Sequence, residues 1–227
     1  MSLTIHHLQR SQSERLPWLC EELQIPYTLT LHKRDPVFSP QSIKDLHSLG
    51  QAPVIQDESL VLAESAACVE YIIHKHGHGK LVLPPSHKDY ADYLYWFHFA
   101  NGNLQPSALQ MLQLSRVCGD SPYAKKHGVR FAKLLELMDT RLKENIWLAG
   151  EEFSAADIMT VFTLTTMRSF CPYDLTGFDG ILAYLQRVVQ REGYKKARAK
   201  ADPELELMIE GKGPRTLMDK LREEGKL

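Results

Sequence analysis

Strand patterns are confined to the first eighty of the 227 residues, and the rest of the chain carries only helix patterns. A short apolar run at 3–8 predicts a buried strand, and apolar residues at helical spacing predict a helix at 13–23. Alternating apolar and polar residues at 27–32 predict a half-buried strand. A strand–helix–strand unit of this kind requires a right-handed crossover, so the two strands are expected to pair in parallel.

A strand hairpin is predicted to complete this first part of the chain. A short helix at 42–49, ended by Gly50, precedes two strand patterns at 53–56 and 60–62. The three residues between those two patterns suit a hairpin and are too few for a crossover. A helix at 65–76 follows. The predicted order is βαβαββα with a parallel half and an antiparallel half, which is a thioredoxin-like layout.

Glycines and prolines between 76 and 88 indicate a linker. The helices predicted beyond the linker span 90–117, 123–145, 154–170 and 178–191. The sequence therefore predicts an α+β protein, with a thioredoxin-like domain at 1–80 and an all-helical domain at 89–200. Residues 201–227 form a polar C-terminal extension that is expected to be partly ordered at best.

Composition argues against several classes of protein. The 27 basic and 28 acidic residues give a net charge of -1, which supplies no basic surface for nucleic acid. The four cysteines and the alternating His74, His76 and His78 lack metal-ligand spacing, so no metal site is expected. The first ten residues lack the apolar run of a secretory signal, and the uncharged stretch 93–115 is too polar to span a membrane. These features predict a cytoplasmic protein with reduced cysteines.

Four separated motifs resemble the glutathione S-transferase family, and within it the serine-type fungal and bacterial members. They are Ser11-Gln-Ser-Glu-Arg15, Gln51-Ala-Pro-Val54, Leu62-Ala-Glu-Ser65 and Phe153-Ser-Ala-Ala-Asp157. The resemblance covers about residues 3–200 and is strongest at 46–73. It implies a homodimer, formed partly through the helix at 90–117, that uses glutathione as its cosubstrate and needs no cofactor.

The resemblance implies a role for each matched residue in holding glutathione. Pro53 stands before a strand and is a candidate cis-proline, which would present the backbone of Val54 to the cysteinyl unit. Glu64 would pair with the γ-glutamyl ammonium, and Ser65, at a helix N-terminus, would hold the γ-glutamyl carboxylate. Gln51 would reach the glycyl carboxylate. Without the resemblance, Glu64 and Ser65 are simply an acidic first turn with a helix cap.

Ser11 is the candidate catalytic residue. A free cysteine thiol has a pKa of about 8.5, and a hydroxyl that donates to the sulfur lowers it by stabilising the thiolate. Ser11 would act as an electrostatic stabiliser, neither nucleophile nor general base. Ser13 is the alternative, although its position better fits a helix cap. Tyr27 lies inside a strand and Cys20 two turns into a helix, which excludes tyrosine-type and cysteine-type sites.

The expected activity is conjugation of the glutathione thiolate to apolar electrophiles, or reduction of organic hydroperoxides, in a cleft between the domains. Tyr95 and Phe99 are candidates to line the electrophile pocket, although a place in the core fits either residue as well. Two alternatives share the fold. One is a non-catalytic module that binds apolar ligands or a partner protein, and the other is a specialised glutathione-dependent isomerase or lyase. The first predicts no thiol activation, and the second predicts no turnover of activated aryl halides.

Overall fold

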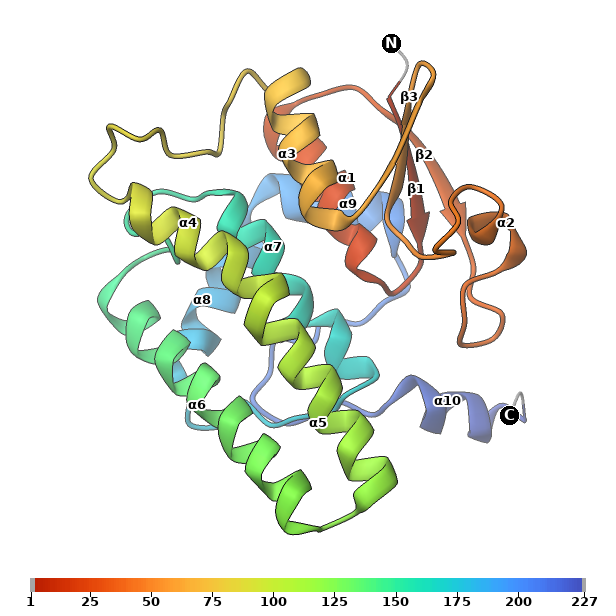
Figure 1. The fold of residues 1–227 in the computed structure, drawn as a ribbon, viewed down its shortest axis with the longest axis vertical. Helices are drawn as coiled ribbons and strands as arrows, with labels where there is room; N and C mark the ends of the chain where they lie inside the picture. The colour runs from red at the N-terminus through yellow and green to blue at the C-terminus, as the bar shows by residue number, and fades with distance from the viewer. Residues whose placement is uncertain (1–2, 226–227) are drawn as a thin grey trace. The chain divides into compact units, whose positions relative to one another are not determined.

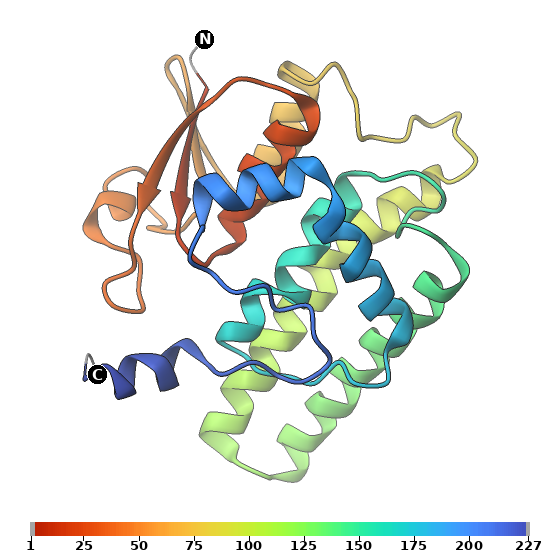
Figure 2. The same ribbon diagram turned by 180° about the vertical axis from the view of Figure 1, so that it is seen from behind.

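The computed structural model describes residues 3–225 and divides into two compact units, which Figures 1 and 2 show from opposite sides. The first unit comprises the chain up to residue 82 together with residues 188–207 and the segment from 217 onward. The second unit comprises residues 83–187 and 208–216. The C-terminal part of the chain thus contributes to both units.

A four-stranded sheet forms the centre of the first unit. Its strands are β1 (Thr4–Leu8), β2 (Thr28–His32), β3 (Val54–Asp57) and β4 (Leu60–Ala63). Their spatial order is β2-β1-β3-β4, with β1 parallel to β2 and antiparallel to β3. β3 and β4 pair as an antiparallel hairpin, at whose turn Glu58 has a φ of 53°. The predicted βαβαββα order and thioredoxin-like layout are confirmed.

Helices cover both faces of this sheet (Figure 1). The helices of this unit are η1 (Gln12–Glu14), α1 (Arg15–Leu23), α2 (Gln41–Lys44), α3 (Ser65–Lys75), α9 (Glu192–Ala201), which packs against α1, and α10 (Leu217–Glu223). On one face, Ile43 of α2 packs against Leu8 and Ala52. Successive side chains of a strand point to opposite faces, so His7 points away from α2, and its ring bonds to Asp202 at the end of α9. Coverage on both faces explains why β1 is buried along almost its whole length.

Two local predictions in this unit are wrong. The helix expected at 42–49 is only Gln41–Lys44, although Gly50 does adopt the positive φ expected of it. Ser13 is not the helix cap, because the chain first makes the 3-10 turn η1, and Ser11 caps that turn. Ser13 Oγ instead turns back to β1, where it accepts a hydrogen bond from Leu8 N at 3.0 Å.

The second unit is helical throughout its regular structure. Its helices are α4 (Tyr90–Phe99), α5 (Gln105–Cys118), α6 (Pro122–Glu144), α7 (Ala155–Leu164) and most of α8 (Asp179–Gln190). The single helix expected at 90–117 is interrupted by a π-helical segment, η2 (Ala100–Leu104). This segment contains Gly102, a weak helix former, and Pro106 just beyond it has no N–H for the regular ladder. The helix expected at 154–170 ends at Leu164 and continues as the 3-10 turn η3 (Thr166–Ser169).

Two buried charged residues organise the second unit. Asp157 closes a capping box at the start of α7, accepting from Ser154 N at 2.9 Å and from Leu148 N at 3.1 Å. Arg168 of η3 donates to five backbone carbonyl oxygens at 2.8–3.2 Å, four of which belong to residues 208–212. Arg168 therefore holds part of the C-terminal extension in place. Among the helices within residues 3–225, none is long and apolar enough to cross a membrane.

Candidate active site

Ser11 lies at the point where the chain leaves β1 and enters η1. Its backbone is extended, and its Oγ accepts a hydrogen bond from Ser13 N at 3.2 Å. The two hydroxyl oxygens of Ser11 and Ser13 are 2.7 Å apart. Ser11 is 6% exposed whereas Ser13 is wholly buried, so Ser11 is the hydroxyl nearer to solvent. This difference favours Ser11 over Ser13 as the residue that meets a ligand.

Hydrogen bonds from Gln12 and Arg15 join three segments that are far apart in the sequence. Gln12 Nε2 donates to Ala52 O at 3.2 Å, in the loop before β3. Arg15 Nη1 donates to Gln12 Oε1 at 3.1 Å and to Ser65 Oγ, at the start of α3, at 2.8 Å. The Ala52–Pro53 peptide bond is cis, and Val54 follows it as the first residue of β3. The turn at Ser11, the cis-proline loop and the start of α3 therefore form one connected surface.

The start of α3 has an unusual backbone. Glu64 occupies the N-cap position with φ 71° and ψ 114°, and its side chain is exposed. Ser65, the first helical residue, is only 2% exposed. A non-glycine residue in such a conformation is strained, and strain of this kind concentrates where a ligand is bound. The backbone N–H groups of the first turn also favour an anion at this place.

A buried cation lies beneath this helix start. Arg15 is wholly buried, and burial lowers its pKa to about 9, while neighbouring Glu14 acts in the opposite direction. The guanidinium is still charged at neutral pH because 9 lies well above 7. Its bond to Ser65 Oγ therefore places a positive charge where the resemblance predicts a carboxylate.

The other predicted residues lie apart from this network. Gln51 is exposed, just before the cis bond. Tyr95 and Phe99 belong to the second unit, where their rings stack with centroids 5.7 Å apart. Tyr95 is 50% exposed, but Phe99 is 3% exposed and belongs to the core of that unit. Of the two aromatic candidates, only Tyr95 presents a surface in the described chain.

Sequence reasoning did not single out Gln12, Arg15, His7 or Asp202. An arginine among the apolar residues of a helix start and a histidine inside a strand were visible signals for Arg15 and His7, because polar residues in such places need partners. No comparable signal marked Asp202. It reaches His7 only through the fold, 195 positions away.

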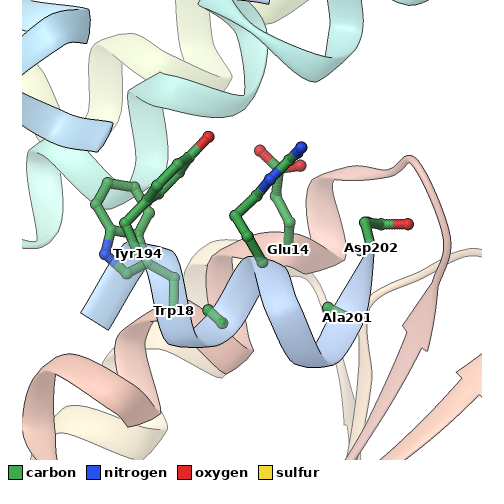
Figure 3. Close-up of a pocket in the computed structure, with 7 residues that line it drawn as sticks. Glu14, Trp18, Tyr194, Ala201 and Asp202 are labelled. Carbon is green, nitrogen blue, oxygen red and sulfur yellow. The ribbon is translucent and has the colours of Figure 1, made fainter. Parts of the chain in front are cut away.

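Several hollows border these residues within the first unit, and one of about 260 Å³ has Arg10 and Asp202 in its lining. A cavity of about 10 Å³ lies between α1 and α9, and Figure 3 shows Trp18 and Tyr194 side by side in its wall. That volume suits about one water molecule and no substrate. A cleft of about 340 Å³ adjoins Arg10, the residue before Ser11, and its lining mixes Lys33 with Glu204. Its mixed charge indicates no particular ligand.

Comparison with known families decides the identity of this fold. The model for the "Glutathione S-transferase, N-terminal domain" matches residues 10–75, and the model for the C-terminal domain matches residues 105–192. The chain belongs to the glutathione S-transferase family. The first match contains the Ser11 turn, the cis-proline loop and the start of α3. The geometry above therefore lies in the part of the chain that resembles the family's N-terminal domain.

Relatives of this glutathione transferase occur in fungi and bacteria. Glutathione S-transferase 3 of Schizosaccharomyces pombe is 29% identical over 71% of this chain and 73% of its own length. Glutathione S-transferase 1 of Saccharomyces cerevisiae is 27% identical over 88% of this chain and 95% of its own. The crystal structure of a glutathione S-transferase from Actinobacillus pleuropneumoniae aligns with a TM-score of 0.81 at 27% identity, covering 88% of this chain and 93% of that one.

Proposed function

We propose that this glutathione transferase conjugates the thiolate of glutathione to apolar electrophiles, and that Ser11 activates the thiol. The observation that carries the proposal is the hydrogen-bonded link between the Ser11 turn, Ala52 and Ser65 through Gln12 and Arg15. The link brings a hydroxyl, a loop backbone and a helix N-terminus onto one surface. These are the groups that a γ-glutamyl-cysteinyl peptide requires.

In the proposed complex, glutathione lies along this surface with its γ-glutamyl end at α3. Ser65 and the first N–H groups of α3 bind the γ-glutamyl carboxylate, and the buried charge of Arg15 adds to the attraction. Glu64 pairs with the ammonium. The backbone of Val54 pairs with the cysteinyl unit as an added strand does. Gln51 binds the glycyl carboxylate, which suits its exposed position before the cis bond.

The Ser11 hydroxyl then donates a hydrogen bond to the glutathione sulfur. The thiolate is favoured because a donor bonded to the charged form lowers the pKa of the thiol. The N-terminus of η1, which Ser11 caps, lies at the same place, although a single 3-10 turn adds little. The nucleophile is the bound thiolate itself, which attacks an electrophilic carbon or the oxygen of a hydroperoxide. We place Tyr95 among the residues that contact the electrophile, because half of its side chain is exposed.

The test is the ultraviolet absorbance of the thiolate of bound glutathione as a function of pH, for the wild-type protein and for Ser11→Ala. We expect a bound thiol pKa well below 8.5 in the wild type. We expect Ser11→Ala to raise it by at least about one unit, equivalent to about 1.4 kcal/mol. The matched control is Ser59→Ala, in the exposed turn between β3 and β4.

Each other outcome supports a different function. Binding of glutathione with an unshifted thiol pKa favours a non-catalytic binding module. An activated thiol that attacks no aryl halide or hydroperoxide favours a specialised isomerase or lyase. Failure to bind glutathione contradicts the proposal altogether.

We also propose a homodimer of reduced, cytoplasmic chains. Leu94 of α4 and Leu109 of α5 are exposed apolar residues that suit a subunit interface. All four cysteines are free, and only Cys118 is exposed. The test is light scattering, which measures the mass of the particle in solution. We expect a dimer for the wild type and a monomer for Leu94→Glu. A monomeric wild type contradicts the proposed homodimer.

A further inference from the structure

A chain of hydrogen bonds runs from Ser11 through the interior of the first unit to the end of α9. Ser11 Oγ lies 2.7 Å from Ser13 Oγ, which lies 2.8 Å from His7 Nδ1. His7 Nε2 lies 2.9 Å from Asp202 Oδ2. Ser13 and His7 are wholly buried, and Asp202 is 5% exposed. The last three groups have the serine–histidine–aspartate order that withdraws a proton from a hydroxyl in other enzymes.

The direction of each hydrogen bond follows from the donors that each group possesses. The Asp202 carboxylate only accepts, so His7 Nε2 carries a hydrogen and donates to it. In neutral His7, Nδ1 is then an acceptor, and Ser13 donates to it. Ser13 has one hydroxyl hydrogen, and His7 Nδ1 at 2.8 Å is a nearer acceptor for it than Leu8 O at 3.2 Å, so Ser11 in turn donates to Ser13. Ser11 Oγ is then left as an acceptor toward the solvent side.

This direction conflicts with the one that a thiolate requires. To donate to sulfur, Ser11 must stop donating to Ser13, and the 2.7 Å bond between the two hydroxyls is kept only if Ser13 donates to Ser11 instead. Ser13 then no longer donates to His7, so His7 Nδ1 must carry a hydrogen of its own. With Nε2 still donating to Asp202, the ring becomes an imidazolium. The outward direction of the Ser11 hydroxyl and the charged state of His7 are therefore coupled.

We propose that His7 takes up the proton of the glutathione thiol through Ser11 and Ser13, and that Asp202 stabilises the imidazolium that results. The inference rests on the proposed function, because it places the glutathione sulfur at Ser11. The S–H bond breaks as its proton passes to Ser11 Oγ. Ser11 passes its own proton to Ser13, Ser13 passes its own to His7 Nδ1, and the Nδ1–H bond forms. The products are a thiolate that accepts from Ser11 and an imidazolium–carboxylate pair.

Other charged and titratable groups surround this pair. His6 of β1 bonds to His32 of β2 at 3.1 Å, and burial, then His6 and His7, lower the pKa of His32. Arg10 N donates to the Asp202 carboxylate at 3.2 Å. Arg34 of the β2–α2 loop and Tyr194 of α9 also interact with Asp202. Glu14 and Arg198 in turn interact with Tyr194. Figure 3 shows Asp202 beyond Ala201 at the end of α9, and Glu14, the last residue of η1, lines the same cavity.

The first experiment measures the pH titration of the bound glutathione thiolate in Ser13→Ala and Asp202→Asn. Ser13→Ala breaks the hydroxyl chain, and Asp202→Asn removes the charge that holds the imidazolium. We expect each to raise the bound thiol pKa by about one unit or more. The affinity for S-methylglutathione, which has no thiol proton, should change less than about threefold, because neither residue contacts the peptide in the proposed complex.

The chain offers a control in a second histidine–aspartate pair, in which the aspartate is buried and the histidine is 19% exposed. His76 Nε2 lies 2.7 Å from Asp57 Oδ2, and Asp57 is 6% exposed, close to the exposure of Asp202. Asp57→Asn therefore makes the same chemical change in the same unit, away from Ser11. It should leave the titration of the bound thiol as it is in the wild type.

A second measurement is made on the wild-type protein, whose site is unaltered, and a variant serves only to assign the signal. In wild-type protein labelled with ¹⁵N-histidine, one imidazole should become doubly protonated at pH 7 when glutathione binds, but not when S-methylglutathione binds. Loss of that resonance in His7→Asn assigns it. An unchanged His7 in the glutathione complex overturns the relay. The relay is also overturned if the bound thiol titrates in both Ser13→Ala and Asp202→Asn as it does in the wild type. If Ser11→Ala still raises the thiol pKa in that case, the proposed function stands without the relay.

Discussion

Arg15 Nη1 lies 2.8 Å from Ser65 Oγ, so a buried guanidinium joins the start of α1 to the start of α3 across fifty positions of sequence. The same nitrogen also bonds to Gln12 Oε1, and Gln12 bonds to Ala52 O. The Ser11 turn and the start of α3, which we propose to activate the thiol and to bind the γ-glutamyl carboxylate, are therefore joined through this side chain. We propose that Arg15 positions these two parts of the glutathione site.

We expect Arg15→Lys to raise the KM for glutathione about tenfold or more, with a smaller fall in kcat. Lysine keeps the charge but does not keep the position of Nη1, which bonds to both partners, and a hydrogen bond to a charged group contributes about 1.5–3 kcal/mol. Steady-state kinetics at saturating electrophile measures both constants. Arg191→Lys, which alters the ion pair of Arg191 with Glu22, is the control and should leave KM unchanged. Equal KM values for Arg15→Lys and wild type would refute the positioning role.

Glu64→Gly should make the protein more stable and a poorer binder of glutathione. Glycine adopts the φ of 71° without strain, so we expect the free energy of unfolding to rise by about 1 kcal/mol. Loss of the carboxylate removes the partner of the γ-glutamyl ammonium. Urea denaturation and calorimetric titration with glutathione measure the two effects. The control is Glu58→Gly, which relieves the backbone strain of a φ of 53° in the β3–β4 turn. It should raise the free energy of unfolding and leave the affinity for glutathione unchanged.

Arg168→Lys should destabilise the second unit by about 3 kcal/mol or more. The five carbonyl oxygens that Arg168 contacts cannot all be satisfied by one ammonium, and unpaired buried carbonyls are unfavourable. Limited proteolysis should become faster within residues 208–216, while urea denaturation reports the overall loss. In Arg187→Lys only one carbonyl contact, to Ile146, is altered, so little change is expected. Unchanged protease resistance in Arg168→Lys would contradict the anchoring role.

Asp157 should make stability depend on pH between about 4 and 6. Burial raises its pKa from 3.8 to about 6, although the N–H groups of Ser154 and Leu148 act in the opposite direction. The folded state therefore binds more protons than the unfolded state in this range. The contribution of Asp157 to the free energy of unfolding is fully present below about pH 4. It is lost as the pH rises through 6, and the loss is at most about 3 kcal/mol.

Urea denaturation from pH 4 to pH 7 compares the wild type with Asp157→Asn, which has no ionisable group at this position. The difference in free energy of unfolding by which the wild type exceeds the variant should shrink as the pH rises. Asp179→Asn, at the exposed start of α8, controls for the loss of a carboxylate and should give a parallel curve. A constant difference between wild type and Asp157→Asn across this range would contradict the prediction.

Local patterns in the sequence were enough to predict the order of elements in the first eighty residues. Alternation at 27–32 predicted β2, and the short break after β3 required the hairpin with β4. The division into a strand-containing part and a helical part followed from the absence of strand patterns after residue 80. These features depend on residues within a few positions of each other, which a single sequence displays directly. Ser11, Glu64 and Ser65 were predicted as site residues in the same way, through contiguous motifs.

Contacts between distant residues were decided only by the tertiary structure. The C-terminal extension looked poorly structured because its sequence is polar, but Arg168 satisfies its carbonyl oxygens and Asp202 bonds to His7. The break of the helix at 90–117 into three segments likewise depended on packing as well as on Pro106 and its neighbours. A buried polar group must find a partner, but the sequence does not say which distant segment supplies it. The roles of Arg15, His7 and Asp202 therefore became visible only once folding had placed their partners beside them.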